Sequence, residues 1–335
     1  FKPAAVKAIA GGSLANAYSI DKSLGSASDV VAIIDAYDSP SAYSNMSKFR
    51  SDNGLKPIID CTSSFNSNSS TWPSAGASPC FVKVNQNLSK SPLPKANSGW
   101  ANEIDLDIQA VSAICPNCSI LLVEANSASL SNLGTAISKT ANLSYVKSIS
   151  NSYGTPSDYS QVTYPAWNFA AANKRVFASS GDAGYQTSAS FPASNTNVVA
   201  VGGTTLNIGS DGKRISESAW SGAGSGCSTS NAKPTWQVGL TSCNFKAVSD
   251  VSAVADPASG LTIFTIYKGR ATYLTLGGTS LASPIVAAVQ AMRGGYTPDA
   301  IKSSNYFEVS TGSNGSCGPA LCSAVTLWDG PTGFG

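Results

Sequence analysis

Short apolar runs that end in small or polar residues recur along the chain. Five segments show this pattern: residues 30–35, 119–125, 146–152, 175–180 and 198–203. Short apolar runs of this kind are typical of strands buried on both faces of a parallel sheet. We therefore predict that these segments form the strands of one central sheet.

Helix-like stretches lie between these runs, at residues 104–114, 130–141 and 165–173. Strands that alternate with helices predict an α/β fold in which a parallel β-sheet is flanked by helices. In such folds the functional residues gather at the carboxyl ends of the strands.

Two long stretches rich in Ser, Asn and Pro, residues 62–79 and 85–98, are predicted to be surface loops. Neither resembles an interdomain linker, and the chain shows no internal repeat or heptad pattern. We therefore predict a single domain over residues 1–335, with several disulfides.

Charge and composition set limits on the partners. The chain has 335 residues, of which 12% are charged, and a net charge of +2 without a basic run or an acidic tail. Nothing here favours nucleic acid or an anionic membrane surface, and no apolar run is long enough to span a bilayer. We expect a monomer that acts without either partner, and the initial Phe1 suggests that a leader and a pro-segment have been removed.

The eight cysteines fall as local pairs. The pairs are Cys61 with Cys80, Cys115 with Cys118, Cys227 with Cys243, and Cys317 with Cys322. We interpret them as four short-loop disulfides of a secreted protein, in an extracellular or acidic secretory-route compartment. Zinc binding or redox chemistry at the Cys115-Pro116-Asn117-Cys118 motif is the alternative, but no second such motif and no histidine would complete a zinc site.

Residues 277–284, Gly-Gly-Thr-Ser-Leu-Ala-Ser-Pro, form a small-residue turn that leads directly into a helix-like run. Such a turn presents a nucleophilic serine, here Ser280, because glycines let a substrate backbone approach and a helix start offers free N–H groups to an oxyanion. The chain contains no histidine. The base that activates this serine is therefore expected to be a carboxylate.

Three acids lie close together within residues 100–111: Glu103, Asp105 and Asp107. On a helix Glu103 and Asp107 share one face, whereas Asp105 points roughly the opposite way. Adjacent carboxylates repel, which raises the pKa of one of them and suits proton transfer. They could also simply be acids at a helix N-terminus, but together with the Gly-Thr-Ser turn they favour an acid–base site.

Asp182 lies in a Ser-Gly-Asp-Ala-Gly segment at the end of an apolar run. By itself this is an ordinary turn. In an α/β peptidase it would place an oxyanion donor, and a carboxyl group donates only when it is protonated, which implies acidic operation or a strongly raised pKa.

Together these motifs make the sequence resemble the sedolisin (serine-carboxyl) peptidases, which have a subtilisin-like fold. The Glu-x-x-x-Asp helix, the Ser-Gly-Asp turn and the Gly-Thr-Ser-x-x-x-Pro segment occur in the family's order, and the resemblance covers nearly the whole chain. It implies that Ser280 attacks the scissile carbonyl and that Glu103 acts as general base and then acid. Asp107 would orient Glu103, and the Asp182 carboxyl with the Ser280 N–H would bind the oxyanion.

The activity that the resemblance implies is a secreted endopeptidase that acts on protein or peptide substrates and is made as a precursor. A carboxylate base has an intrinsic pKa of about 4, so an acidic optimum is expected. A tripeptidyl exopeptidase, a catalytically inactive binding relative, and an esterase or amidase that uses the same site are the alternatives.

Further positions resemble substrate-binding and supporting positions of subtilisin-like enzymes. Ser152, Tyr153 and Gly154 resemble the strand edge that pairs with a substrate backbone, although a plain buried strand end would give the same pattern. Asp35 resembles the triad aspartate of ordinary subtilisins. Without a histidine to orient, we interpret Asp35, and Asp38 likewise, as structural or as supporting a catalytic group.

The family also has a calcium site near its C-terminus. The matching residues here are Glu308, Val309, Val325, Leu327 and Asp329. The sequence departs from the family's pattern, with Glu in place of Asp and with Val and Leu in place of two glycines. Carboxylate and carbonyl oxygens could still bind Ca²⁺, but lost glycines restrict the backbone angles.

Overall fold

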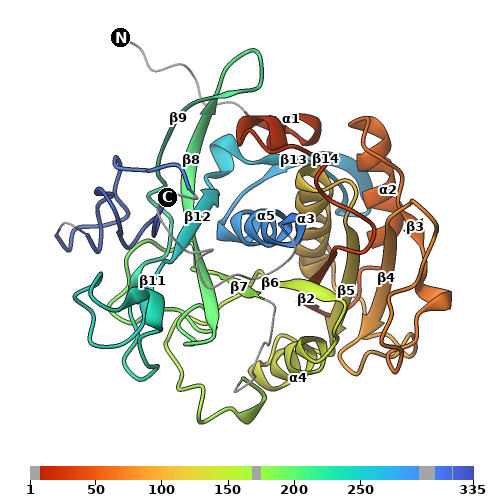
Figure 1. The fold of residues 1–335 in the computed structure, drawn as a ribbon, viewed down its shortest axis with the longest axis horizontal. Helices are drawn as coiled ribbons and strands as arrows, with labels where there is room; N and C mark the ends of the chain where they lie inside the picture. The colour runs from red at the N-terminus through yellow and green to blue at the C-terminus, as the bar shows by residue number, and fades with distance from the viewer. Residues whose placement is uncertain (1–7, 168–174, 294–305, 319) are drawn as a thin grey trace.

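The central sheet consists of parallel strands, as predicted. The computed structural model describes residues 8–167, 175–293, 306–318 and 320–335. Within these residues nine strands form one sheet in the order β12-β8-β7-β6-β2-β5-β4-β3, with β9 paired to β8 (Figure 1). Every neighbouring pair in this order is parallel, and only β9 runs antiparallel to β8.

The predicted strands match five of these elements. The sheet contains β2 (Val30–Ala36), β3 (Ile59–Asp60), β4 (Cys80–Asn85), β5 (Ser119–Ala125), β6 (Val146–Asn151), β7 (Arg175–Ser179), β8 (Val198–Ile208), β9 (Arg214–Ala219) and β12 (Val251–Val254). The bounds of β2, β5, β6 and β7 agree with the prediction to within one residue. β8 extends beyond residue 203 because its second half pairs with β9.

The helices are α1 (Gly11–Ala17), α2 (Ala42–Asp52), α3 (Ser98–Ile114), α4 (Leu130–Ala141) and α5 (Thr279–Met292). α4 has the predicted bounds, whereas α3 begins earlier than predicted. The side chain of Asn97 caps it by accepting hydrogen bonds from the N–H groups of Gly99 (2.9 Å) and Trp100 (3.1 Å). Of the helix predicted at residues 165–173, Pro165–Trp167 is a short 3-10 helix, η2, and the rest lies outside the described residues.

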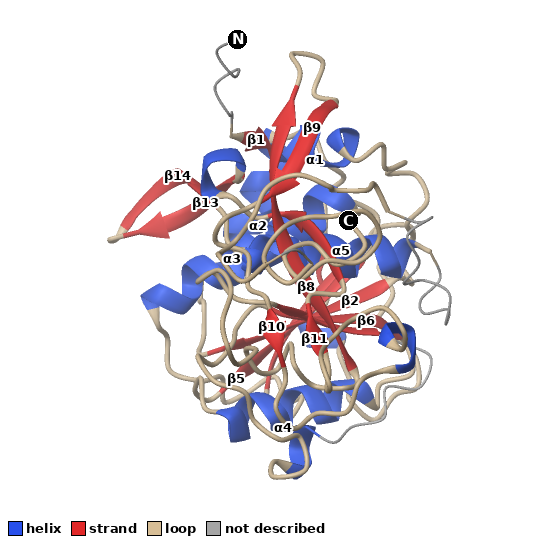
Figure 2. Cartoon of the chain, turned by 90° about the vertical axis from the view of Figure 1, so that its left-hand side faces the viewer, coloured by secondary structure: helices blue, strands red, loops and turns tan. Residues whose placement is uncertain are grey.

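Two hydrophobic cores lie on opposite faces of the sheet. Along β2, Val31 and Ile33 point into the core beneath α3 and α5, whereas Val30, Ala32 and Ile34 belong to the core on the α4 side. Figures 1 and 2 show this layering, with α4 on one side of the sheet and α3 and α5 on the other. Strands buried on both faces explain why the apolar runs are continuous rather than alternating.

A second, three-stranded sheet packs beside α3. It consists of β1 (Ile9–Ala10), β13 (Leu261–Tyr267) and β14 (Arg270–Leu276), and β13 and β14 form the hairpin that projects from the body in Figure 2. A two-stranded sheet pairs β10 (Gly226–Cys227) with β11 (Ala247–Val248).

All four predicted cysteine pairs are disulfide-bonded. The bond between Cys115 and Cys118 leaves no thiolate for zinc, so this alternative is wrong for that pair. Cross-links of this kind form and persist in oxidising compartments, which fits an extracellular protein.

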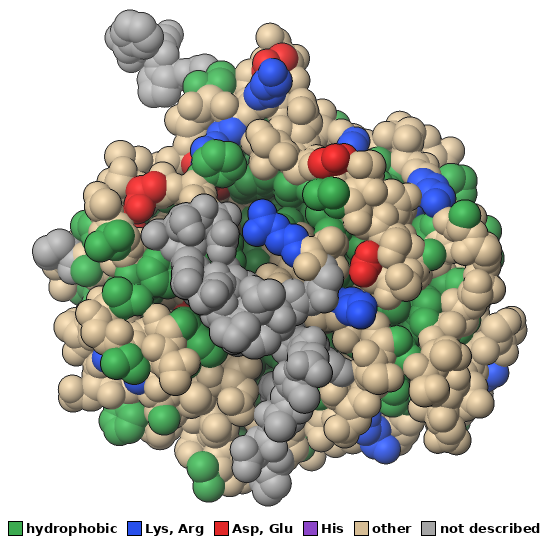
Figure 3. Space-filling model, viewed as in Figure 1, with side chains coloured by type: hydrophobic (Ala, Val, Ile, Leu, Met, Phe, Trp, Pro, Cys, Tyr) green, Lys and Arg blue, Asp and Glu red, His purple; other side chains and the backbone are tan. Residues whose placement is uncertain are grey.

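The surface carries dispersed charge. On the face drawn in Figure 3, lysine, arginine, aspartate and glutamate side chains are scattered among polar and apolar ones. Of the described helices, none combines the length and apolarity that crossing a membrane requires.

Candidate active site

Ser280 lies in the first turn of α5. The residue that precedes this helix, Gly278, has a backbone conformation that glycine adopts readily and other residues rarely do. Gly278 precedes the helix with a φ of 96°, in the left-handed region. A Cβ added at Gly278 would lie 2.5 Å from Oδ2 of Asp182. The Gly-Thr-Ser turn therefore brings the backbone of the nucleophile against the Asp182 carboxyl.

Pro284 ties this turn to strand β6. Proline has no N–H, so the carbonyl of Ser280, four residues earlier, lacks its usual partner within the helix. The hydroxyl of Ser152 donates to this carbonyl instead, at 3.1 Å. Ser152, at the carboxyl end of β6, thus holds the first turn of α5 against the sheet.

Glu103 comes from α3 and meets Ser280 from the other side. Its carboxylate lies close enough to the Ser280 side chain for that side chain to influence its pKa, and Oε1 is closed to solvent without a hydrogen-bond partner among the described residues. Loss of hydration raises the pKa of Glu103 to about 7, the neighbouring Ser280 side chain opposes this rise, and the nearby Asp182 charge adds to it. Glu103 is therefore a stronger base than a solvated glutamate, and it is placed at a serine hydroxyl.

Asp107 lies one turn further along α3 and is fully buried. Burial raises its pKa well above the ordinary value, the charges of Asp35 and Glu103 raise it further, and the nearby Ser152 hydroxyl acts in the opposite direction. Glu103 and Asp107 therefore share one face of the helix, as predicted. Asp105 points the other way, where its Oδ2 accepts hydrogen bonds from Asn45 (2.8 Å) and Thr265 (2.7 Å).

A row of buried carboxyl groups continues from Asp107 along the carboxyl ends of the strands. Asp35 on β2 stands opposite Glu124 on β5, and both are fully buried. Burial, with the charges of Glu103 and Glu124, raises the pKa of Asp35, and burial raises that of Glu124 to about 9. At the far end Lys83 forms an ion pair with Asp38 (2.6 Å) and lies 3.9 Å from Glu124. The sequence indicated a supporting place for Asp35 but gave no sign of Glu124.

Asp182 follows β7 and contacts the residue before the nucleophile. Its Oδ1 accepts hydrogen bonds from the backbone N–H and the hydroxyl of Thr279, both at 2.8 Å. Ser280, Glu103, Asp107 and Asp182 are therefore brought together, although they come from three separate segments of the chain. Thr279 was part of the motif, but the sequence assigned no role to its side chain.

A cavity of about 390 Å³ opens beside Ser280 and Asp182. The predicted edge residues Tyr153 and Gly154 line it, whereas Ser152 is buried behind it against α5. Ser190 also lines the cavity, next to Gly154. It lies in a segment without any motif, so the sequence could not have indicated it.

The predicted calcium residues lie together near the C-terminus. Glu308 accepts a hydrogen bond from the N–H of Leu327 (3.2 Å), and Asp329 accepts one from the N–H of Val325 (3.1 Å). Leu327 adopts the left-handed conformation that the family's glycine would provide, with a φ of 77°. Val309 is buried beside Glu308. Two carboxylates therefore lie near each other beside one loop, and carboxylate oxygens are among the ligands that Ca²⁺ takes.

No three histidine, cysteine, aspartate or glutamate side chains converge on a metal position in the part of the chain that the structure describes. A calcium ion here would therefore depend largely on backbone carbonyls.

The fold and this constellation define a subtilisin-like serine peptidase. The chain belongs to the subtilase family, whose family model matches residues 86–304, more than half of the sequence. The predicted resemblance to the sedolisins is also confirmed. Sedolisin from Pseudomonas sp. (strain 101) is 33% identical over 172 residues, and the match covers 44% of this chain and 28% of that protein.

Solved structures agree with this assignment. The structure of Pseudomonas sedolisin, a serine-carboxyl proteinase complexed with two molecules of pseudo-iodotyrostatin, matches with a TM-score of 0.78 and 25% identity, over 99% of this chain and 96% of that one. A lanthipeptide protease matches with a TM-score of 0.57 and 15% identity, over 97% of this chain and 90% of that one. The second likeness shows the shared fold alone.

Proposed function

We propose that this protein is an acid-acting serine-carboxyl endopeptidase in which Ser280, Glu103 and Asp107 form the catalytic triad. The observation that carries the proposal is the position of the Glu103 carboxylate beside the Ser280 side chain, which influences its pKa, in a chain without histidine. A nucleophile within reach of a base whose pKa is raised is the arrangement that covalent catalysis needs.

In the proposed reaction, the Ser280 oxygen attacks the scissile carbonyl while Glu103 takes the hydroxyl proton. The oxyanion that forms is bound by the protonated Asp182 carboxyl and the Ser280 N–H. Glu103 then gives its proton to the leaving amine, which releases the first product and leaves an acyl-enzyme. Water, deprotonated by Glu103, hydrolyses this ester and restores Ser280.

The proposed acidic optimum follows from two opposite requirements. Glu103 acts as a base only when it is ionised, and Asp182 donates to an oxyanion only when it is protonated. Strong acid protonates Glu103 and so removes the base, whereas neutral pH would remove the proton that Asp182 donates. A plot of activity against pH should therefore be bell-shaped.

We also propose that the protein cleaves bonds within polypeptide chains, that it is secreted, and that it matures from a precursor. Gly154 at the cavity edge is exposed, which supports binding of an extended chain, and four disulfides support secretion. Peptides of equal length with blocked or free N-termini test the first point. Endopeptidase action predicts cleavage of both, whereas a tripeptidyl exopeptidase would leave the blocked peptides intact.

Hydrolysis of a denatured protein across acidic and neutral pH tests the central proposal. Ser280→Ala should abolish activity, and Glu103→Gln should reduce it by about six orders of magnitude, as loss of a triad base does. Ser283→Ala is the matched control, because Ser283 lies on the same helix and its hydroxyl contacts Ser150 (2.8 Å) rather than the site. Wild-type rates in a folded Ser280→Ala protein would overturn the proposal.

We further propose that Glu308 and Asp329, with the carbonyls of Val309, Val325 and Leu327, hold a structural Ca²⁺ ion. The ion would neutralise two carboxylates that meet in one loop cluster. Calcium should raise the unfolding temperature of the wild-type protein in a concentration-dependent way and leave a Glu308→Gln protein unaffected. The same unfolding temperature with calcium and with a chelator would refute this assignment.

A further inference from the structure

The hairpin of β13 and β14 leads directly into the turn that carries Ser280. β14 ends at Leu276, and only two glycines separate it from α5. Through β13 the hairpin packs against α2 and α3, and the rest of it projects from the body (Figure 2). The helix that carries Glu103 and Asp107 is therefore in contact with the element that leads to the proposed nucleophile.

Three polar side chains join α3 to β13. Oγ1 of Thr265 lies 2.9 Å from Oδ1 of Asn102 and 2.7 Å from Oδ2 of Asp105. A hydroxyl has one proton to donate, and both of these oxygens are acceptors when Asp105 is ionised. A proton on Asp105 completes both contacts, because Asp105 then donates to Thr265 and Thr265 donates to Asn102. This arrangement is here called the α3–β13 contact.

The site of Asp105 favours the neutral carboxyl group. Asp105, Thr265 and Asn45 are buried, and Oδ1 of Asp105 has no hydrogen-bond partner among the described residues. Burial raises the pKa of Asp105 to about 7, and hydrogen bonds to Thr265 and Asn45 oppose this rise. A buried carboxylate without a cation is strongly unfavourable, so ionisation should favour a state in which Asp105 reaches water.

The other titratable groups of the neighbouring elements are engaged elsewhere. Those of α2 are bonded to other partners: Tyr43, Lys48, Arg50 and Asp52. Those of the hairpin are exposed: Tyr267, Lys268, Arg270 and Tyr273. On α3 itself, Glu103 and Asp107 lie on the opposite face. None of these described groups supplies a cation that would stabilise an ionised Asp105.

We propose that Thr265 and the protonated Asp105 are positioning residues, which hold α3 against the hairpin and so keep Glu103 in place beside Ser280. The inference rests on the proposed triad. Gln109 makes a second contact one turn further along α3, where it accepts from the N–H of Phe264 (2.8 Å) and donates to its carbonyl (2.7 Å). An amide does not titrate, so ionisation of Asp105 towards neutral pH loosens one of two contacts and leaves the other intact.

Hydrogen exchange tests the α3–β13 contact in the Ser280→Ala protein, where self-cleavage through Ser280 is absent. Protection factors in β13 and β14, corrected for the intrinsic effect of pH on exchange, should fall about 50-fold from pH 5 to pH 7. This fall follows if Asp105, with a folded pKa of about 7, regains a pKa of about 4 on opening. Its protonated form stabilises the contact in acid, and that contribution is lost as pH rises.

Asp105→Asn, added to the same protein, supplies an amide that donates to Thr265 at every pH. The fall in protection should then be less than about fivefold, because the group that titrates is gone. Asp211→Asn, at an exposed position, is the matched control and should leave the 50-fold fall unchanged. Equal falls in the Asp105→Asn and Asp211→Asn proteins would overturn the pH dependence of the contact.

Steady-state kinetics at about pH 4 tests the positioning role. Thr265→Val keeps the shape of the side chain but removes its hydroxyl, and kcat should fall about tenfold with little change in KM. Thr265→Ser should restore most of kcat. Thr262→Val is the matched control on the same strand, since the Thr262 hydroxyl contacts Thr275 (3.1 Å) rather than α3. A folded Thr265→Val protein with wild-type kcat would overturn the inference.

The two measurements separate this inference from the proposed function. The exchange experiment uses neither Thr265→Val nor any activity, so it decides the α3–β13 contact even if that variant does not fold. The expected exchange result in a protein whose wild-type form cleaves nothing would support the contact and refute the peptidase. Cleavage by the wild-type protein with equal exchange in the two aspartate variants would refute the contact and leave the peptidase standing.

Discussion

Thr279 gives the two oxygens of the Asp182 carboxyl different surroundings. Oδ1 accepts two hydrogen bonds from Thr279, and the Thr279 hydroxyl oxygen in turn accepts from the N–H of Gly181 at 3.1 Å. Oδ2 lies over Gly278, on the side of the nucleophile. In the proposed mechanism the Asp182 carboxyl carries a proton, and because Oδ1 already accepts two hydrogen bonds, that proton would lie on Oδ2.

Thr279→Val should therefore lower kcat with little change in KM. The loss should be about tenfold, since one hydrogen bond contributes about 1 kcal/mol or somewhat more and 1.4 kcal/mol is tenfold in rate. Thr279→Ser keeps the hydroxyl and should restore most of kcat. Steady-state kinetics on a peptide substrate measures both variants, and a valine variant with wild-type kcat would show that the hydroxyl has no positioning role.

Asp182→Asn should change the shape of the pH profile. An amide donates at every pH, so the loss of activity towards neutral pH should diminish. The acidic limb should stay nearly in place, because in the proposed mechanism Asp182 is already neutral there and an amide carries the same charge. Profiles of kcat/KM for both proteins measure this, and an unchanged alkaline limb would mean that protonation of Asp182 does not limit the reaction.

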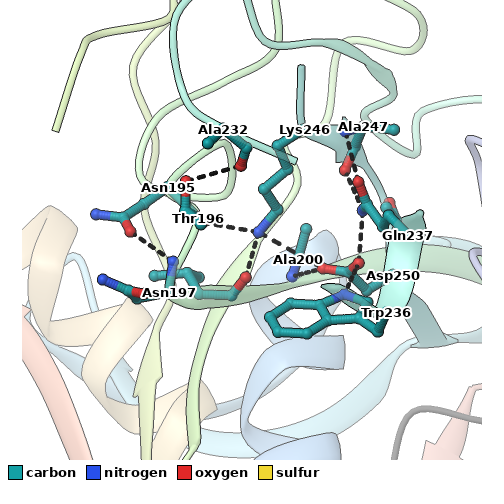
Figure 4. A network of polar contacts seen from close by, with 12 residues as sticks. Asn195, Thr196, Asn197, Ala200, Ala232, Trp236, Gln237, Lys246, Ala247 and Asp250 are labelled. Carbon is teal, nitrogen blue, oxygen red and sulfur yellow. Dashed lines mark hydrogen bonds and ion pairs between the residues drawn. The ribbon is translucent and has the colours of Figure 1, made fainter. Parts of the chain in front are cut away.

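At the scale of elements, a buried ion pair joins the segments around β11 and β12. Lys246 donates to the carbonyl of Asn195 (2.8 Å) and lies 3.6 Å from Asp250, and both side chains are fully buried (Figure 4). Asp250 also accepts hydrogen bonds from Trp236 (2.6 Å) and Gln237 (2.7 Å). The pair thus links the start of β12 to the segment before β8 and to the short 3-10 helix η3 (Thr235–Gln237).

Lys246→Met should destabilise the protein by about 3–5 kcal/mol, because it leaves the Asp250 carboxylate buried without its cation. Lys213→Met, at an exposed position, is the matched control and should change stability by less than about 0.5 kcal/mol. Urea unfolding at one pH measures both. Equal stability of the two variants would mean that the buried pair contributes nothing beyond its methylene packing.

For the whole molecule, the buried carboxyl groups predict a stability that falls as pH rises. Burial raises the pKa of six of them: Asp35, Glu103, Asp105, Asp107, Glu124 and Asp329. A raised pKa means that the folded protein binds protons more tightly than the unfolded chain does. Each group therefore stabilises the fold fully below its unfolded pKa of about 4, and this contribution is lost as pH rises through the folded value.

Asp105→Asn isolates one of these contributions, because the pKa of Asp105 is raised to about 7 at a position outside the proposed triad. The free energy of unfolding of the wild-type protein should decrease between about pH 4 and pH 7, and the variant should show a shallower slope. Asp211→Asn, at an exposed position, should leave the slope unchanged. Urea titrations at several pH values measure this, and a wild-type stability that rises across this range would contradict the prediction.

The sequence by itself predicted five strands of the central sheet, the four disulfides and the candidate residues of the site. Runs such as residues 120–123 are apolar throughout because both faces of the sheet are covered, so their strands could be predicted from local pattern alone. The absence of histidine favoured a carboxylate as the base, and the spacing of Glu103 and Asp107 placed both on one helix face. These features depend on residues close in sequence, where local geometry is fixed by the backbone.

Tertiary structure alone decided which distant groups meet. Thr279 bonds Asp182, Ser190 faces Gly154, and Glu124 stands opposite Asp35 because separate strands and helices pack together. The directions of the pKa shifts could not be predicted from the sequence either, because they depend on burial and on charges from other segments. The sequence thus supplies the side chains that are suited to the proposed reaction. Packing sets the distances between them, their hydration and the shape of the cavity beside them.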